Sequence, residues 1–236
     1  MHTWLSLSLN DVRNVVRDRL LLVIFFIPAI LLLFTRSIMP IALVQFPDLA
    51  NYQHIITMLA SAQIPTCFGL IASFVMLDEK DERVFEALRS LPISANRFIA
   101  FRLGWVFGFS TLGSAMFMAF SGLGYLHPLG LILAAILYGM LSILITLLIV
   151  TYTQNKVEGL AVFKGLNIAL YLPVLPWIWS QPWIKAFGIL PSYWPFAAVS
   201  HAYEGQLFLS TFLIGFSILG IIVMILLSQF KRRVFR

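Results

Sequence analysis

Long apolar stretches, each bounded by charged or turn-forming residues, dominate the chain. A helix needs about 20 mostly apolar residues to cross a bilayer whose hydrocarbon core is about 30 Å thick. The interval 103–155 is long enough for two crossings, and glycines together with His127 and Pro128 mark a turn at its middle. The pattern therefore predicts six membrane-spanning helices, within residues 20–35 (extending past Arg36), 49–77, 103–155 (two helices), 159–179 and 205–230.

Residues 3–19, ahead of the first predicted span, show the period of an amphipathic helix. The apolar positions recur at helical spacing at Leu5, Leu9, Val12 and Val16. Arginines and aspartate fall on the opposite side, and Trp4 suits the depth of the membrane interface. We expect a helix that lies along the inner membrane surface. An inward extension of the first span is the alternative.

Residues 180–204, between the fifth and sixth predicted spans, are apolar and aromatic but repeatedly interrupted by proline. The prolines are Pro182, Pro191 and Pro195. These breaks leave no uninterrupted helix long enough for another crossing. We expect short re-entrant or interfacial helices that cap the outer mouth of the bundle. A plain aromatic belt at the outer interface is the alternative.

The composition agrees with a membrane protein. The chain has 236 residues, of which 60% are hydrophobic and 11% charged, and its mean hydropathy is +0.92. Soluble domains carry about 25% charged residues, so this chain has too few charges to cover a soluble surface. A soluble enzyme, a disordered chain and a nucleic-acid-binding protein are thereby excluded. The fold class we predict is an all-α integral membrane protein, with residues 1–236 forming a single transmembrane domain.

The distribution of lysine and arginine predicts the orientation. If six spans are correct, one side carries 14 of the 16 basic residues and the other carries only Arg36 and Lys185. Because basic residues gather on the cytoplasmic side, both termini are expected in the cytoplasm of a multi-pass protein of the cell membrane. The net charge of +6 is therefore interpreted as a topology signal and not as a nucleic-acid-binding surface.

Residues that carry catalytic or metal-binding chemistry are scarce. The single cysteine, Cys67, excludes an intrachain disulfide and a multi-cysteine metal site. His201 and Glu204 are spaced three apart, but two ligands without a third make a weak metal site. No glycine-rich phosphate-binding loop ending in Lys-Ser or Lys-Thr occurs in the sequence. We therefore predict no catalytic residue, no metal site and no cofactor bound by this chain.

An acidic segment lies between the second and third predicted spans. Residues 77–94 read LDEKDERVFEALRSLPIS, and five of the ten acidic residues fall within 78–86. As a helix, the segment would place Val84, Phe85, Leu88 and Leu91 on one face and Glu79, Glu82, Glu86 and Arg89 on the other. A pairing of Glu79 with Arg83 would support it. The pattern predicts a short amphipathic helix that ends at Pro92 and joins two spans, with an ordinary solvated loop helix as the alternative.

This segment resembles the signature of the ABC-2 family of ATP-binding-cassette transporter permeases. In that family a stretch of the type E-x-x-E-x-x-x-E-x-L precedes a Ser/Thr-x-Pro-Ile/Leu turn. The matching residues are Glu79, Glu82, Glu86, Leu88, Ser90, Pro92 and Ile93. The chain departs from the family at Arg83 and Val84, where Gly-Thr is common. Among the members it is most similar to the short six-span drug-export permeases.

The resemblance implies a function and partners. Residues 79–90 would form the coupling helix that contacts a separate ABC-type ATPase, through Glu79, Glu82, Arg83, Phe85, Glu86, Leu88 and Arg89. ATP and Mg²⁺ would bind to that ATPase, and the permease would act as a homodimer or as a heterodimer with a related permease. This chain would then be a transport subunit, not an enzyme.

The spans indicate the chemistry of the cargo. Their middle parts contain almost no ionisable residues, which a transporter of protons or small ions usually needs. The mild polar residues of spans two and five are candidates for lining a substrate pathway: Asn51, His54, Gln63, Thr66, Asn167 and Tyr171. An amphiphilic or hydrophobic cargo is expected, such as a drug, a peptide or a lipid-like molecule, moved outward. A haem-export-type permease of cytochrome assembly, and a channel or scaffold that uses no ATP, are the alternatives.

Overall fold

The computed structural model describes residues 18–82, 95–179, 182–205 and 209–234. Within these ranges the regular structure is helical throughout, which confirms the predicted all-α class. Six helices are long and apolar enough to cross a membrane, the number expected from the sequence. They are α2 (Arg19–Gln45), α3 (Gln53–Asp81), α5 (Ala95–Phe120), α6 (Pro128–Tyr152), α7 (Lys156–Tyr171), which continues into η3 (Leu172–Trp177), and α9 (Leu209–Val234).

The helix boundaries follow from the local sequence. Asp18 caps α2, because its Oδ1 accepts the backbone N–H groups of Leu20 and Leu21 at 3.0 and 3.4 Å. The helix runs past Arg36 to Gln45, as expected, and a single 3₁₀ segment, η1 (Pro47–Tyr52), leads from it into α3. Asn155 caps α7 by accepting the N–H of Glu158 at 3.0 Å.

The fifth span changes its helix type partway. α7 has 16 residues, about 24 Å at 1.5 Å per residue, which is less than the thickness of a bilayer core. The 3₁₀ segment η3 continues it and contains Pro173 and Pro176. Because proline lacks a backbone N–H and its ring clashes with the preceding turn, the regular α-helix ends before them.

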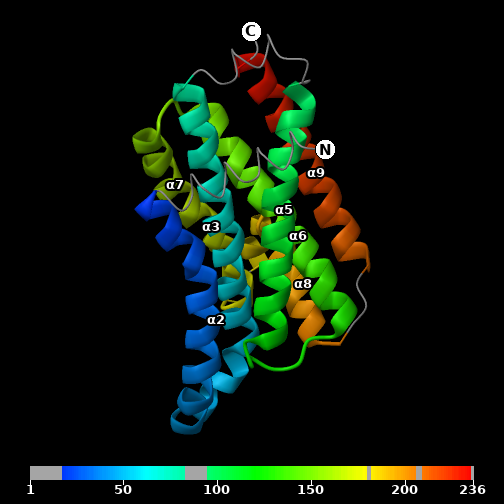
Figure 1. Ribbon diagram of the computed structural model, residues 1–236. Helices are drawn as coiled ribbons and strands as arrows, with labels where there is room; N and C mark the ends of the chain where they lie inside the picture. The colour runs from blue at the N-terminus through cyan, green and yellow to red at the C-terminus, as the bar shows by residue number, and fades with distance from the viewer. Residues whose placement is uncertain (1–17, 83–94, 180–181, 206–208, 235–236) are drawn as a thin grey trace.

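Two helices form the centre of the bundle. The apolar windows of α3 and α6 are mostly buried, and α3 and α6 pack against each other, with α5 beside both. α2, α7 and α9 lie around them, and only a small share of their apolar windows is buried, as expected for surfaces that face lipid (Figure 1). Several serine and threonine hydroxyls in the central helices donate to carbonyls: Thr146, for example, donates to Ser142 O at 2.8 Å.

The segment between the fifth and sixth spans contains η4 (Pro182–Ile189) and α8 (Tyr193–Tyr203). α8 packs against α3, α6 and α9, and six consecutive residues from Pro195 to Ser200 are buried. Figure 1 shows α8 beside the lower half of α6, inside the bundle. The chain between the two spans therefore forms short helices, as predicted, and the second of them contributes to the core. Its depth in a membrane stays a prediction.

Two predicted elements fall largely outside the described residues. Of the surface helix expected at 3–19, only Asp18 and Arg19 are described. Of the coupling helix expected at 79–90, only residues 79–82 are described. Residues 79–81 form the last turn of α3 and so continue the second span without a break.

Candidate functional site

Charged side chains converge where α3 ends. We call this region the charged end and define it by Asp78, Glu79, Lys80, Arg102 and Lys156. Glu79 pairs with Arg102 of α5. Lys156 Nζ, at the start of α7, lies 2.8 Å from Asp78 Oδ2 and 2.9 Å from Asp18 Oδ2. Lys80 Nζ donates to the carbonyl of Thr153 at 2.9 Å. The last turn of α3 is thereby bound to α5, to the C-cap of α6 and to the start of α7, and Lys156 links it to the Asp18 cap of α2.

The contact with Lys156 also affects the pKa of the Asp18 carboxylate. A hydrogen bond from Lys156 lowers the pKa of Asp18 below its ordinary value of 3.8, burial opposes that shift, and the N–H groups of the first α2 turn add to it. Asp18 is therefore ionised at neutral pH, where it caps α2 and binds α7 at once. α9 reaches the charged end as well, since Arg233 Nη1 donates to Thr151 O at 3.0 Å.

The position of Glu79 differs from the expectation of an outward-facing acidic surface. Its side chain is 13% exposed and pairs with Arg102 of α5. The physical reason is that α3 continues through Asp81, which leaves Glu79 inside the bundle beside α5. Glu82, by contrast, is exposed at the C-cap of α3. Arg83, Phe85, Glu86, Leu88 and Arg89 lie outside the described residues, so their predicted contact with an ATPase stays a prediction. The predicted pairing of Glu79 with Arg83 stays a prediction as well, because Arg83 is not among the described residues.

Four predicted pathway residues lie where α3 meets α7. The Tyr171 hydroxyl donates to Gln63 Oε1 at 2.7 Å, a bond between side chains of the two helices. Gln63 Nε2 lies 3.6 Å from the sulfur of Cys67, within range of a weak hydrogen bond. Thr66 is buried and donates to the carbonyl of Gln63, 2.7 Å away in its own helix. Asn167 is half-buried one turn before Tyr171.

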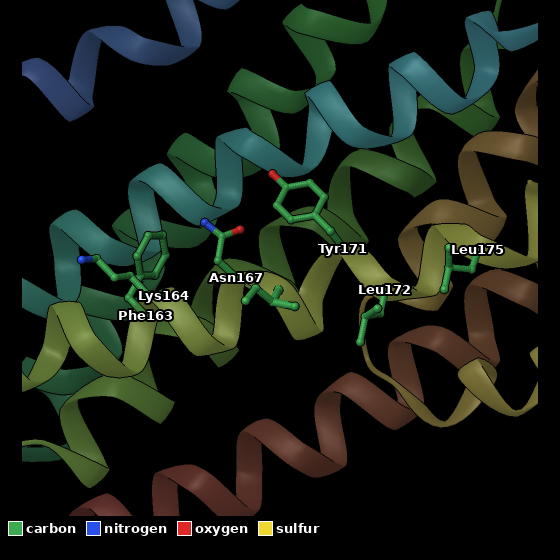
Figure 2. A pocket seen from close by; sticks show the side chains of 7 residues that line it. Phe163, Lys164, Asn167, Tyr171, Leu172 and Leu175 are labelled. Atoms are coloured by element: carbon green, nitrogen blue, oxygen red, sulfur yellow. The ribbon is translucent and has the colours of Figure 1, made fainter.

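A hollow of about 570 Å³ opens along this flank of α7. Its lining is mostly apolar and comes from α7 and η3: Phe163, Lys164, Asn167, Ile168, Tyr171, Leu172 and Leu175. Figure 2 shows the Tyr171 hydroxyl directed toward α3 and the Lys164 side chain extended toward the N-terminal end of α7. The volume lies within the range of about 300–1,000 Å³ that small-molecule sites occupy.

The other two predicted pathway residues lie elsewhere. Asn51 is exposed on η1, and the His54 ring is 6.4 Å from the Tyr203 ring of α8. Nine residues separate His54 from Gln63, which corresponds to about 13 Å along α3. The structure thus divides the six candidates into a pair at the end opposite the charged end and a group at the α3–α7 contact.

Three residues of these sites were not predicted from the sequence. Arg102 and Lys156 were assigned only to topology, and Lys164 was treated as an inner-end residue of the fifth span. The sequence signal for Lys164 was a lysine inside an otherwise apolar stretch. For Arg102 and Lys156 no local signal indicates the ion pairs described here, because Glu79 and Asp18 lie 23 and 138 positions away in the chain.

Comparison with known proteins places the chain in a family. The family described as "Fluoroquinolones export permease protein Rv2686c-like" matches residues 11–227. Two proteins of Mycobacterium tuberculosis are each 30% identical over 198 residues, which cover 78% of this chain and 77% of theirs: Fluoroquinolones export permease protein MT2760 (strain CDC 1551 / Oshkosh) and Fluoroquinolones export permease protein Rv2686c (strain ATCC 25618 / H37Rv). No solved structure matches. With its six apolar helices, the chain therefore belongs to the Rv2686c-like family of fluoroquinolone export permeases.

Proposed function

We propose that this chain is the membrane subunit of an ATP-binding-cassette exporter that moves a fluoroquinolone-like drug out of the cell. ATP and Mg²⁺ bind to a separate ATPase subunit, and two permease chains together form the pathway. Both termini lie in the cytoplasm, on the side of the charged end. The names of the relatives support a permease that moves drugs out of the cell over a haem exporter or a passive channel.

The observation that carries the proposal is the attachment of the last turn of α3. Residues 83–94 begin where α3 ends, and α3 is bound there to α5 through Glu79 and to α7 through Asp78. A force on residues 83–94 is therefore applied to three spans at once. Gln63 lies 16 residues before Glu79, about 24 Å along the same helix. Displacement of α3 at the charged end would change its contact with α7 at the hollow.

Coupling to a separate ATPase is tested with paired charge reversals in the acidic segment. Glu82→Arg with Glu86→Arg is expected to abolish co-purification of an ABC-type ATPase and ATP-dependent efflux of norfloxacin from cells that express both chains. Asp48→Arg makes the same kind of change on exposed η1, at the opposite end, and should leave both intact. Full efflux by the double reversal contradicts the proposed coupling.

A further inference from the structure

Lys164 places a positive charge well inside the fifth span. It lies eight residues after the start of α7, about 12 Å along the helix. Its side chain is exposed on the flank of α7, and none of the ion pairs found in the described ranges includes it. Ionisable side chains within membrane spans are costly, and they either reach the interface or face a polar partner. The charge of Lys164 therefore needs an anion or water.

The surroundings of Lys164 make a site of mixed chemistry. Lys164 lines the hollow at the end nearer the start of α7, and Asn167 lines it one turn further on. Beyond them the lining is aromatic and aliphatic, ending at Leu175. Eleven residues separate Lys164 from Leu175, which corresponds to roughly 16 Å of helix. The hollow thus offers a cation at one end, an amide in between and an apolar surface at the other end.

We infer that the hollow selects drugs that carry a carboxylate, and that Lys164 is the residue that binds this carboxylate. The inference rests on the proposed function and specifies its substrate class: an aromatic amphiphile with an acid at one edge. The flat ring system lies along Phe163 and Tyr171, and the Asn167 amide hydrogen-bonds to a ring carbonyl. Pairing with the carboxylate satisfies the charge of Lys164 in apolar surroundings, where a charge-assisted hydrogen bond is stronger than a neutral one.

Fluoroquinolones provide a matched pair of probes, because esterification removes the charge of the carboxylate and leaves the ring system unchanged. Binding of norfloxacin and of its methyl ester to the full-length chain is measured by ligand fluorescence in lipid nanodiscs without ATP. The wild type is expected to bind the acid about ten-fold more tightly than the ester, the factor for one charge-assisted hydrogen bond. Lys164→Gln should bring the two affinities to within about two-fold, and Lys164→Arg should keep the preference.

A control variant separates this effect from net charge. Arg232→Gln removes one positive charge from the exposed end of α9 and should leave the acid-to-ester ratio unchanged. If Lys164 only reaches for the membrane interface, the wild type and Lys164→Gln will show the same ratio, and the inference is overturned while drug binding stands. If the wild type binds neither form, the proposed function itself fails and the inference fails with it.

Discussion

Glu79 of α3 and Arg102 of α5 form an ion pair in which the two side chains are only 13% and 10% exposed. The Arg102 guanidinium also lies over the Phe98 ring, with its central carbon 5.3 Å from the ring centroid. The pair joins the two helices between which residues 83–94 run. Each end of that segment is therefore attached to a helix, and the nearly buried charge pair fixes the position of one helix relative to the other.

Removing one partner of this pair should be more damaging than removing both. Glu79→Gln or Arg102→Gln leaves the opposite charge in a nearly buried place without its partner in this pair, at a cost of about 3 kcal/mol. The double variant removes both charges and should recover part of the loss. The midpoint of thermal unfolding in detergent measures the effect. Additive losses in the double variant would show that the two side chains do not depend on each other.

The Asp18–Lys156 contact predicts a pH dependence. Because the pKa of Asp18 is lowered in the folded protein, its stabilisation is present at neutral pH and is lost as the pH falls through that lowered value. Asp18→Asn keeps the α2 cap but loses the charge. Above about pH 5, the wild type should have a higher midpoint of thermal unfolding than Asp18→Asn. The gap should begin to narrow near the ordinary value of 3.8 and close as the pH falls through the lowered value. A gap that does not narrow as the pH falls below 3.8 would contradict the assignment.

Gly139 lies at a close approach between α6 and α5. A Cβ placed there would be 2.1 Å from Thr111 Oγ1 and 2.9 Å from the Phe107 ring. Gly139→Ala is therefore expected to destabilise the bundle by about 1–3 kcal/mol through overpacking. Gly165→Ala is the matched control, since nothing lies within 4 Å of its added Cβ. It should stabilise α7 by about 0.5–1 kcal/mol.

A second change at the same contact checks this explanation. Thr111→Ala removes the nearest atom and should restore part of the stability of Gly139→Ala. Equal thermal midpoints for Gly139→Ala with and without Thr111→Ala would show that the hydroxyl is not the obstacle.

The Tyr203 hydroxyl links α8 to α3 and to the backbone at Leu123. It lies 2.7 Å from Thr57 Oγ1 on α3, and it donates to the carbonyl of Leu123. Tyr203→Phe should lower the free energy of unfolding by about 1 kcal/mol, the typical value for a buried hydrogen bond. A double-mutant cycle with Thr57→Val measures the α3–α8 contribution. A coupling energy of zero would mean that α8 is held by its apolar packing alone.

The number and approximate position of the spans could be predicted from the sequence, because the bilayer thickness fixes the length of an apolar helix. Pro182, Pro191 and Pro195 likewise marked the short helices between the last two spans. Tyr171 and Gln63 were both selected as candidates for their polarity in apolar stretches. Their direct bond depends on how α7 crosses α3, which no local pattern encodes.

The partners of the charged residues could not be predicted in the same way. Helical spacing favours Arg83 as a partner of Glu79, because residues four apart share a face, and that pairing stays a prediction. The packing of α5 against α3 brings Arg102 to the same carboxylate, a contact that helical spacing does not indicate. Lys156 meets Asp18 across 138 positions of sequence. Such pairs are selected by tertiary packing, and only a three-dimensional arrangement of the helices reveals them.

α9 packs against α6 and α8 along one side and leaves Ile221, Met224 and Ile225 exposed on the other. If that outer side contacts only hydrocarbon tails, the shape of its side chains is not constrained, because fluid lipid adapts to any apolar side chain. Evolution can then exchange isoleucine, leucine, methionine and phenylalanine there freely. Relatives of this protein should differ most along that stripe, and charged side chains should be rare in it.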